Sequence, residues 1–432
     1  MLERIAQFFE IPKRQSTIST ELLAGLSTFL ALSYIFVVNP AILAQAGIDR
    51  NAVLFATIVT SALATLVMGL WANLPFALAP GMEMNAYVAF FVVGSLGFSW
   101  QQALGACFWS GILFVLLTIS GLRERIIGAI PDRMKASLSL SVGVFLGLIA
   151  LKLAGLLHYK GVRIAGLGDL LSPPAYAFFV GLALVLLLGW LRIRAAVLIS
   201  IIATSTLCGY LGIRGGAEET GRASGAMLSA VGAVDLTVIL NPRIFNIVLI
   251  LFLIDFYGSV AKLVGLTTRT TIVEDGRLPR MRNALLVDGA ATVLGSTLGT
   301  SSITAYVESA VGITAGGRTG LTAVVCGVLM GACFTATPLL KYIPVAATTG
   351  ALFWVGIQLC PSWRDLRSYG WTDILALGVM QIAVVATFAI DRAMLAGFVV
   401  YLVVDLLNKR RPNPYLAGSA ILLTLGAVLQ LI

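Results

Sequence analysis

Long apolar runs, separated by short polar segments, recur along the whole chain of 432 residues. A helix needs about 20 apolar residues to cross the hydrocarbon core of a bilayer, and most of these runs approach that length. No run shows the strict alternation of apolar and polar residues that is typical of strands in a membrane barrel. The pattern therefore predicts an all-α polytopic membrane protein.

We expect fourteen membrane spans and one further apolar segment. The spans cover about residues 21–43, 52–72, 75–95, 101–121, 134–155, 173–191, 193–212, 243–266, 281–299, 302–316, 319–340, 344–360, 371–390 and 391–408, and the further segment covers 414–432. The first twenty residues carry charges and lack an uninterrupted apolar run, so we expect no cleavable signal peptide there.

The longest polar stretch divides the predicted spans into two sets of seven. An odd number of spans in each half gives the second half the opposite orientation, which is the condition for an inverted repeat. The predicted organisation is a cytoplasmic segment (1–20), a first repeat (21–212), an extracytoplasmic linker (213–242), a second repeat (243–408) and a C-terminal apolar segment (409–432).

The third and tenth spans are short and interrupted. They read "PFALAPGMEMNAYVAFF" and "SSITAYVESAVGITAGG", and both contain glycine, proline or small polar residues near an amide or a carboxylate. Paired interrupted helices at corresponding positions of two halves are a pointer to a transporter binding site near the middle of the membrane. We therefore expect spans 3 and 10 to be discontinuous.

Composition and charge support this class and set the orientation. Charged residues make up 11% of the chain, against about 25% in soluble domains, and 59% of residues are hydrophobic. The net charge of +9 has no soluble basic domain to carry it, so we expect membrane lipid and no nucleic acid as a partner. With the N-terminus inside, 19 of the 29 lysines and arginines lie on the cytoplasmic side and nine outside. This asymmetry predicts a cytoplasmic N-terminus, and we expect a multi-pass protein of the plasma membrane (the bacterial inner membrane).

Four ionisable residues fall inside predicted spans, where each costs several kcal/mol unless it faces a cavity or a partner. They are Glu83, Asp255, Lys262 and Glu308. Asn85 is an amide at similar depth, whereas Asn39 precedes a proline and is interpreted as a helix-end cap. Carboxylates and an amide can bind the N–H groups of a neutral heterocycle, and buried carboxylates can carry a proton during transport. The residues alone predict a secondary transporter and leave its substrate open.

Glu83 and Lys262 are predicted to form a structural ion pair. Lys262 follows Asp255 by seven residues, so it lies about 10 Å further toward the cytoplasm at the usual helical rise. Glu83 precedes Asn85 on a span that runs outward, so both charges reach a similar depth. Pairing avoids an isolated buried ion, a defect that costs about 3–5 kcal/mol.

Three motifs resemble those of one transporter family. They are "ELLAGLSTFLALSYIFVVNPAIL", "MGLWANLPFALAPGMEMNA" and "GTSSITAYVESAVGITAGGRTGLTAVV". Over nearly all of its first 360 residues, the chain resembles the nucleobase–cation symporter-2 family, in the AzgA-like branch of adenine, guanine and hypoxanthine permeases.

The resemblance implies a seven-plus-seven inverted repeat. Spans 1–4 and 8–11 would form a core domain, and spans 5–7 and 12–14 a gate domain, with spans 3 and 10 built as half-helices with short strands. It implies import of purine bases with protons and no cofactor. The substrate-binding residues would be Glu308, Asp255, Asn85, Val307, Ser309 and Met84, with Asp255 and Glu308 as the proton-coupling residues.

Four positions depart from the family pattern. Gly258 stands where the family has a second aspartate, and Ser259 and Lys262 stand in place of threonines. Glu83 replaces a glycine. These changes leave the choice of substrate open.

Several alternatives remain. A transporter of the same fold could carry xanthine, uracil or an organic anion, for which Lys262 is the only cationic candidate near the site. An intramembrane enzyme is disfavoured because the chain lacks H-E-x-x-H and G-x-S-x-G motifs, and a channel does not need paired interrupted helices. We expect no enzyme activity, cofactor or metal. The coupling ion (H⁺ or Na⁺) and a homodimer are left open.

Overall fold

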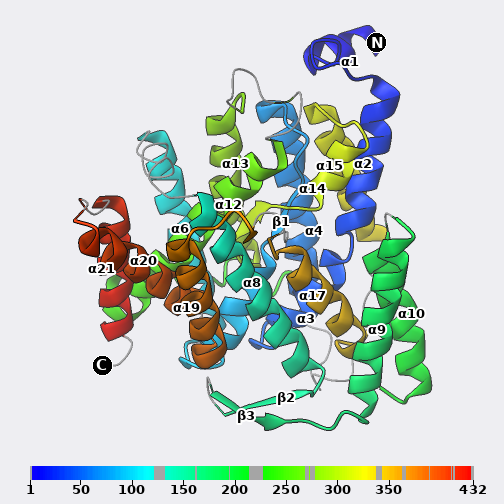
Figure 1. Cartoon of the computed structure of the whole chain (residues 1–432). Helices are drawn as coiled ribbons and strands as arrows, with labels where there is room; N and C mark the ends of the chain where they lie inside the picture. The colour runs from blue at the N-terminus through cyan, green and yellow to red at the C-terminus, as the bar shows by residue number, and fades with distance from the viewer. Residues whose placement is uncertain are drawn as a thin grey trace.

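The structure is a computed structural model. It describes residues 2–120, 132–160, 163–193, 195–213, 227–267, 272, 278–336, 343–361, 366–388, 390–409, 411 and 414–429. Figure 1 shows a bundle of helices with two small pairs of strands, one near the centre of the bundle and one at the end opposite the N-terminal helix.

In the first half of the chain, the predicted spans are helical except where short strands intervene. The elements are α1 (Leu2–Phe8), α2 (Ile18–Leu32), α3 (Ile35–Ala44), α4 (Arg50–Val67), the π-helix η1 (Met68–Ala72), β1 (Leu78–Pro80), α5 (Met82–Ala86), the π-helix η2 (Tyr87–Val93), α6 (Trp100–Ile119), α8 (Asp132–Leu153), β2 (Leu157–Lys160), β3 (Arg163–Leu167), α9 (Pro173–Trp190) and α10 (Ala196–Tyr210).

The second half likewise places a short strand between helices. Its elements are the 3₁₀-helix η3 (Leu236–Leu240), α12 (Pro242–Thr267), α13 (Met281–Leu298), β4 (Ile303–Ala305), α14 (Ser309–Thr314), α15 (Gly320–Ala332), the 3₁₀-helix η4 (Cys333–Ala336), α17 (Ala346–Gln358), α19 (Trp371–Thr387), α20 (Ile390–Leu407) and α21 (Pro414–Leu429).

The ends of several helices follow local capping chemistry. The Asp49 carboxylate accepts hydrogen bonds from the backbone N–H groups of Asn51 and Ala52, the second and third residues of α4. Ser99 and Gln102 form a reciprocal capping box at the start of α6, and the Thr319 hydroxyl accepts from Leu321 N at the start of α15. These side chains satisfy N–H groups that have no partner inside the helix.

Every predicted apolar segment contains a helix. Within the described ranges, five helical segments are long and apolar enough to cross a bilayer by length and composition: Ile18–Ala44, Arg50–Ala72, Trp100–Ile119, Ala136–Leu153 and Pro173–Trp190. The count of fourteen crossings stays a prediction. Of the predicted linker, residues 214–226 lie outside the described residues, while Asp235 N donates to Gln101 O and so attaches the remainder to α6.

Two expectations need correction. The prediction of an all-α protein missed the antiparallel pair of β2 with β3, whereas the antiparallel pair of β1 with β4 agrees with the short strands that the family resemblance implies for spans 3 and 10. Asn39 is not a helix-end cap. It lies fully buried inside α3, and its amide nitrogen donates to the hydroxyls of Thr57 (2.7 Å) and Thr300 (3.0 Å). An amide buried among helices needs such partners, and only the folded chain supplies them.

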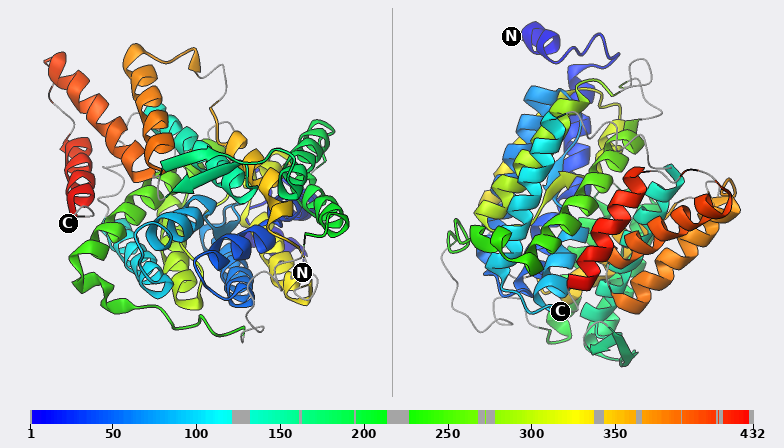
Figure 2. Two further views of the ribbon diagram at one scale, coloured as in Figure 1. Left: turned by 90° about the horizontal axis from the view of Figure 1, so that it is seen from below. Right: turned by 90° about the vertical axis from the view of Figure 1, so that its left-hand side faces the viewer.

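The helices pack in two groups whose members come from both halves of the chain. In one group α6 packs against α13, and α15 packs against α2 and α4. In the other, α17 packs against α8 and α9, and α19 packs against α8 and α20. Gly320 and Gly69 bring α15 and η1 into close backbone contact, because a Cβ on Gly320 would lie 1.9 Å from the Gly69 carbonyl oxygen. Figure 2 shows the same bundle from two further sides, with α20 and α21 at its edge.

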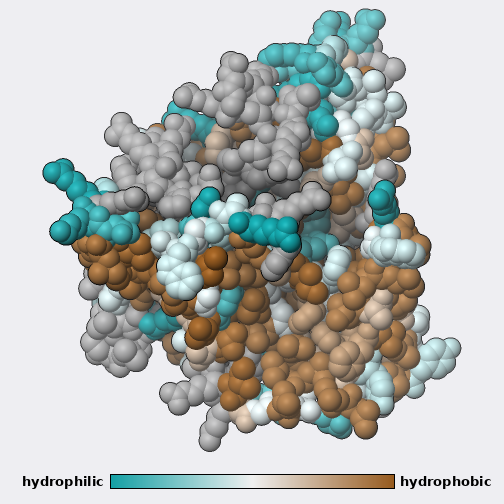
Figure 3. Space-filling model, in the orientation of Figure 1, coloured by the Kyte–Doolittle hydropathy of each residue, from teal (hydrophilic) through white to brown (hydrophobic). Residues whose placement is uncertain are grey.

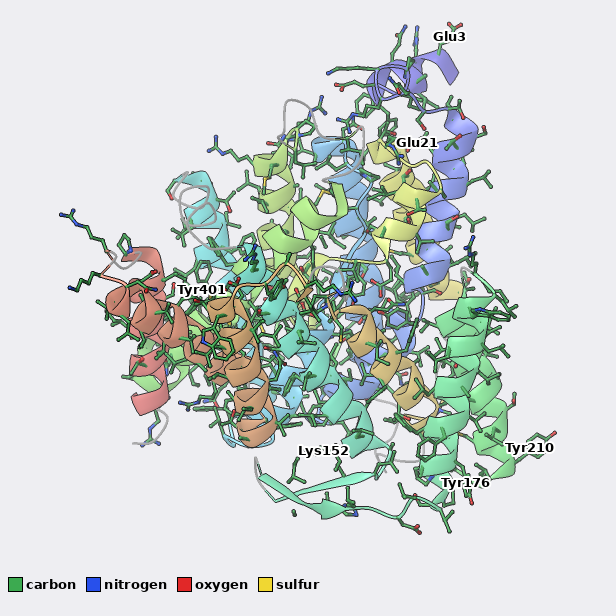
Figure 4. The ribbon with its side chains drawn as sticks, viewed as in Figure 1. Glu3, Glu21, Lys152, Tyr176, Tyr210 and Tyr401 are labelled. Carbon is green, nitrogen blue, oxygen red and sulfur yellow. The ribbon has the colours of Figure 1, made fainter. Side chains whose placement is uncertain are left out.

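Consecutive helices α8, α9 and α10 alternate in direction. Lys152 near the end of α8, Tyr176 near the start of α9 and Tyr210 at the end of α10 share one end of the bundle, while Glu3 and Glu21 lie toward the other (Figure 4). On the face shown in Figure 3, a wide hydrophobic surface is bordered by hydrophilic residues around the N-terminal helix. Such a surface on a long helical bundle fits a multi-pass membrane protein.

Candidate functional site

The two interrupted segments meet as a pair of short strands inside the bundle. β1 and β4 pair with Ala79 opposite Thr304, and all six strand residues are buried. A threonine on a neighbouring helix satisfies each strand in the same way. Thr65 on α4 accepts from Leu78 N and donates to Leu78 O, and Thr292 on α13 accepts from Ile303 N and donates to Ile303 O. The two halves thus hold their central strands with equivalent contacts.

Short helices follow both strands. α5 with η2 covers twelve residues, Met82–Val93, and α14 covers six. At about 1.5 Å per residue both are shorter than the ~30 Å hydrocarbon core. Further hydrogen bonds join the segments, because Ala77 N donates to the Ser309 hydroxyl (3.0 Å) and the Tyr306 hydroxyl donates to Pro80 O (2.6 Å).

A cavity opens beside this crossing point. It encloses about 320 Å³ of non-atom space, a figure that includes the open solvent at its mouth. Its lining residues come from the strand–helix segments, α12 and the facing helices. They are Tyr34, Met82, Glu83, Leu146, Lys262, Tyr306, Val307, Glu308, Val355 and Leu359.

Glu308 presents a carboxylate to this cavity and is 7% exposed. Its Oε1 accepts a hydrogen bond of 2.6 Å from the Tyr34 hydroxyl. Its Oε2 is buried and has no hydrogen-bond partner among the described residues. A buried carboxylate oxygen without a donor is costly in an empty site, and a bound N–H group would satisfy it.

Glu83 and Lys262 also line the cavity and lie in contact. The Lys262 ammonium nitrogen is 2.7 Å from Glu83 Oε1, and the two side chains are 16% and 12% exposed. The structure therefore brings together two charges that are 179 positions apart in sequence. That the pair is structural and does not contact substrate remains a prediction.

Asp255 lies next to the cavity but outside its lining. It is 3% exposed, and its Oδ1 accepts from the Ser259 hydroxyl one helical turn later (3.2 Å). The Ser259 hydroxyl is 3.1 Å from the Thr304 hydroxyl on β4, and Thr304 Oγ1 is 3.5 Å from the Lys262 ammonium nitrogen. A line of polar groups thus connects Asp255 with Lys262 and Glu83.

The remaining predicted site residues also fall into one that lines the cavity and others that do not. Val307 lines the cavity. Asn85, Met84 and Ser309 are buried behind it: the Asn85 carbonyl oxygen accepts from the Ser301 hydroxyl, and Ser309 is engaged by Ala77 N. None of these three side chains is in the cavity lining in this conformation, so their part in substrate binding stays a prediction.

The sequence did not indicate several of the residues that line the cavity. Tyr34 and Tyr306 stand inside the motifs "YIFVVNP" and "TAYVESA", next to residues that were singled out, and this proximity could have suggested them. Leu146, Val355 and Leu359 come from α8 and the end of α17 and carry no local signal, since an apolar residue in a membrane helix is ordinary.

The chemistry of the cavity follows from this inventory. Its polar side chains are two carboxylates, one ammonium group and two tyrosines, and the other five lining residues are apolar. Both tyrosine hydroxyls donate their hydrogen to protein oxygens, so the ammonium group is the side-chain donor still available among the lining residues. The arrangement suits a small, flat, mainly apolar molecule with several N–H donors and an acceptor.

Comparison with known proteins gives the class and then the family. A family model described as a permease family, Xan_ur_permease, matches residues 19–362. The chain therefore belongs to this family of permeases, and its predicted membership in the AzgA-like nucleobase–cation symporters is confirmed. It is a transporter and not an enzyme.

Curated relatives match along almost the whole chain. The adenine permease AdeP of Escherichia coli (strain K12) is 36% identical over 440 residues, covering 100% of this chain and 96% of the relative. The guanine/hypoxanthine permease PbuO of Bacillus subtilis (strain 168) is 33% identical over 408 residues, covering 92% and 93%.

Solved structures with the same fold are distant in sequence. The transmembrane domain of the cyanobacterial bicarbonate transporter BicA aligns with a TM-score of 0.64 at 16% identity, covering 88% of this chain and 96% of that one. The murine anion transporter Slc26a9, in an inward-facing state, aligns with a TM-score of 0.67 at 12% identity, covering 94% and 72%. These likenesses establish a shared helical transporter fold.

Proposed function

We propose that this protein imports purine nucleobases, of the adenine, guanine and hypoxanthine class, by proton symport. The observation that carries this proposal is the Glu308 carboxylate, which faces a mainly apolar cavity with one oxygen unbonded among the described residues. Ring N–H groups are the donors that such an oxygen would accept. The names of the curated relatives support the same substrate class.

The charge of the cavity favours a neutral base over an anion. Glu83 and Lys262 cancel, so the lining side chains carry a net charge of −1 when Glu308 is ionised and of zero when it holds a proton, and never a positive charge. An organic anion would find no net positive charge there, although the bicarbonate and anion transporters share the fold. The alternative substrates, an organic anion in particular, therefore receive less support than a purine.

We further propose alternating access between a core and a gate domain. The core would contain α2–α6 and α12–α15, and the gate α8–α10 and α17–α20, in agreement with the two observed packing groups. The equivalent clamps by Thr65 and Thr292 support an inverted repeat of seven plus seven spans, with spans 3 and 10 discontinuous. The cavity lies between residues of both groups, where relative motion would open it to one side and then the other.

The proton carriers in this proposal are Asp255 and Glu308. Both are buried carboxylates close to the cavity, and intramembrane acids mark proton relays in transporters. The excess of lysine and arginine on one side supports a cytoplasmic N-terminus in a bacterial inner membrane.

The test is uptake of radiolabelled adenine, guanine, hypoxanthine, xanthine and uracil into cells that lack their own permeases. Accumulation of a purine that a protonophore abolishes is expected. Replacing external Na⁺ by K⁺ should leave uptake unchanged. Uptake of uracil alone would contradict the purine assignment, and accumulation that survives the protonophore but requires Na⁺ would contradict proton coupling.

A further inference from the structure

The Lys262 ammonium group has more hydrogen-bonding capacity than its ion pair uses. An ammonium group carries three N–H donors. One points to Glu83 Oε1 at 2.7 Å, and the contact with the Thr304 hydroxyl is long at 3.5 Å. Since Lys262 lines the cavity, its remaining donor capacity is available to a molecule bound there.

Glu308 offers the complementary acceptor in the same cavity. Its Oε2 lacks a hydrogen-bond partner among the residues that the structure describes, and the Tyr34 hydroxyl fixes the other oxygen. A carboxylate can accept from two neighbouring N–H groups at once. The cavity thus combines a charged acceptor with a charged donor, within otherwise mostly apolar walls.

We propose that Lys262 contacts the substrate and selects purines with a 6-carbonyl oxygen next to N–H donors, the guanine type, over adenine. This inference rests on the proposed function as a purine carrier. Guanine presents its O6 acceptor, its N1–H and its 2-amino group along one edge. Lysine is a common donor to guanine O6, and the two adjacent N–H groups match the Glu308 carboxylate.

Adenine fits the same groups less well. Its corresponding edge has one amino group beside a ring nitrogen that carries a lone pair and no hydrogen. Only one of the two hydrogen bonds to the carboxylate can then form, and the ring nitrogen lies against a negative charge. Sites built around such hydrogen bonds reject analogues that lack them more strongly than apolar pockets do. The relatives do not decide the matter, since they include both adenine and guanine/hypoxanthine permeases.

The role of Glu83 in this arrangement is to position the ammonium group. Glu83 and Lys262 are joined at 2.7 Å and are both partly exposed to the cavity, so the pair can hold its place while the lysine binds a carbonyl oxygen. This assigns to the pair a specificity role beyond the structural one expected from the sequence.

The test compares the wild-type protein with two matched variants in competition assays, using labelled hypoxanthine and, separately, labelled adenine. Unlabelled guanine, hypoxanthine and adenine are the competitors. In the wild type, guanine should compete at least about ten-fold better than adenine, and hypoxanthine, which has the 6-carbonyl oxygen and N1–H but no 2-amino group, should fall between them. In the double variant Glu83→Gln/Lys262→Met, which removes both charges together, this ratio should fall by roughly ten- to hundred-fold.

The control is the double variant Glu10→Gln/Arg280→Met, which removes an ion pair of the same length whose residues do not line the cavity. It should keep the preference for 6-carbonyl purines. Equal competition by adenine in the wild type, or an unchanged ratio in the double variant, would overturn the inference. The wild-type ratio needs no variant, so a double variant that fails to fold does not block the test.

A wrong assignment of purines as substrates would give a different result in these assays from a wrong role for Lys262. If neither labelled base enters the cells, the purine assignment itself is wrong and this inference falls with it. If labelled adenine enters and 6-carbonyl purines do not compete, the purine assignment stands and the selection by Lys262 is refuted.

Discussion

The two strand–helix segments at the centre of the molecule share their architecture but differ in the state of their carboxylates. β1 leads into α5 and β4 leads into α14, and a threonine from the preceding helix clamps each strand. Glu83 in the first segment has a lysine at 2.7 Å. Glu308 in the second has a tyrosine hydroxyl on one oxygen and no partner for the other among the described residues.

This difference separates a compensated charge from an uncompensated one. A paired carboxylate is already stabilised when the cavity is empty, so it gains little from a ligand beyond what its partner lysine can offer. A buried carboxylate with one oxygen that accepts no hydrogen bond is stabilised when it binds a donor or a proton. Similar backbones therefore present two acids that we expect to respond very differently to substitution.

The largest effect, a loss of stability, should come from breaking the ion pair between Glu83 and Lys262. Lys262→Met leaves Glu83 as an isolated buried charge and should destabilise the protein by about 3–5 kcal/mol. Thermal unfolding of the purified protein in detergent measures this. The double variant Glu83→Gln/Lys262→Met should recover most of the loss. An unfolding temperature of the single variant equal to that of the wild type would show that the two side chains are solvated and that their pairing does not stabilise the protein.

The next largest effect, a loss of purine affinity, should come from replacing Glu308. Glu308→Ala removes the charged acceptor, which should weaken purine binding by about 1.5–3 kcal/mol, or roughly ten- to hundred-fold. Equilibrium binding to the purified protein is the measurement. Glu308→Gln keeps one acceptor oxygen and should fall between the alanine variant and the wild type. Full affinity in a folded Glu308→Ala protein would remove Glu308 from the site.

A smaller effect separates the two tyrosines of the cavity. Tyr34→Phe removes the hydroxyl that orients Glu308 and should weaken binding by about 1 kcal/mol, roughly five-fold. Tyr306→Phe is the matched control, because its hydroxyl donates to Pro80 O and joins the two segments. We expect this control to lower stability with little change in substrate affinity. The same loss of affinity in both variants would show that Tyr34 does not act through Glu308.

The smallest effect on binding is expected at Asp255, which lies outside the cavity lining. Asp255→Asn should bind purine within about two-fold of the wild type, because the amide still accepts from Ser259. It should nevertheless fail to accumulate substrate, since an amide cannot carry a proton. Binding and uptake measured side by side over a range of pH would show this. Accumulation with unchanged pH dependence would place coupling at another residue.

Much of the fold could be predicted from the apolar pattern, because membrane spans are long and chemically uniform. The predicted segments 101–121 and 173–191 match α6 (Trp100–Ile119) and α9 (Pro173–Trp190) to within two residues. Interruptions were visible too, since proline, glycine and serine stand out in an apolar run. The pairing of β1 with β4 came only from the family resemblance, because three-residue strands carry no periodicity of their own.

The sequence by itself determined which residues are candidates for the site, because a charge inside an apolar run is conspicuous and costly. It indicated Glu308, Glu83 and Lys262, and the matched depths of the last two predicted their contact. Only the tertiary structure decided what each group touches. Asn85, Met84 and Ser309 are buried but do not line the cavity, whereas Glu83 and Lys262 do. Tyr34 and apolar residues of α8 and α17, from distant parts of the chain, complete the lining. Depth in a membrane follows from counting residues along a helix, whereas the direction in which a side chain points depends on how neighbouring helices pack.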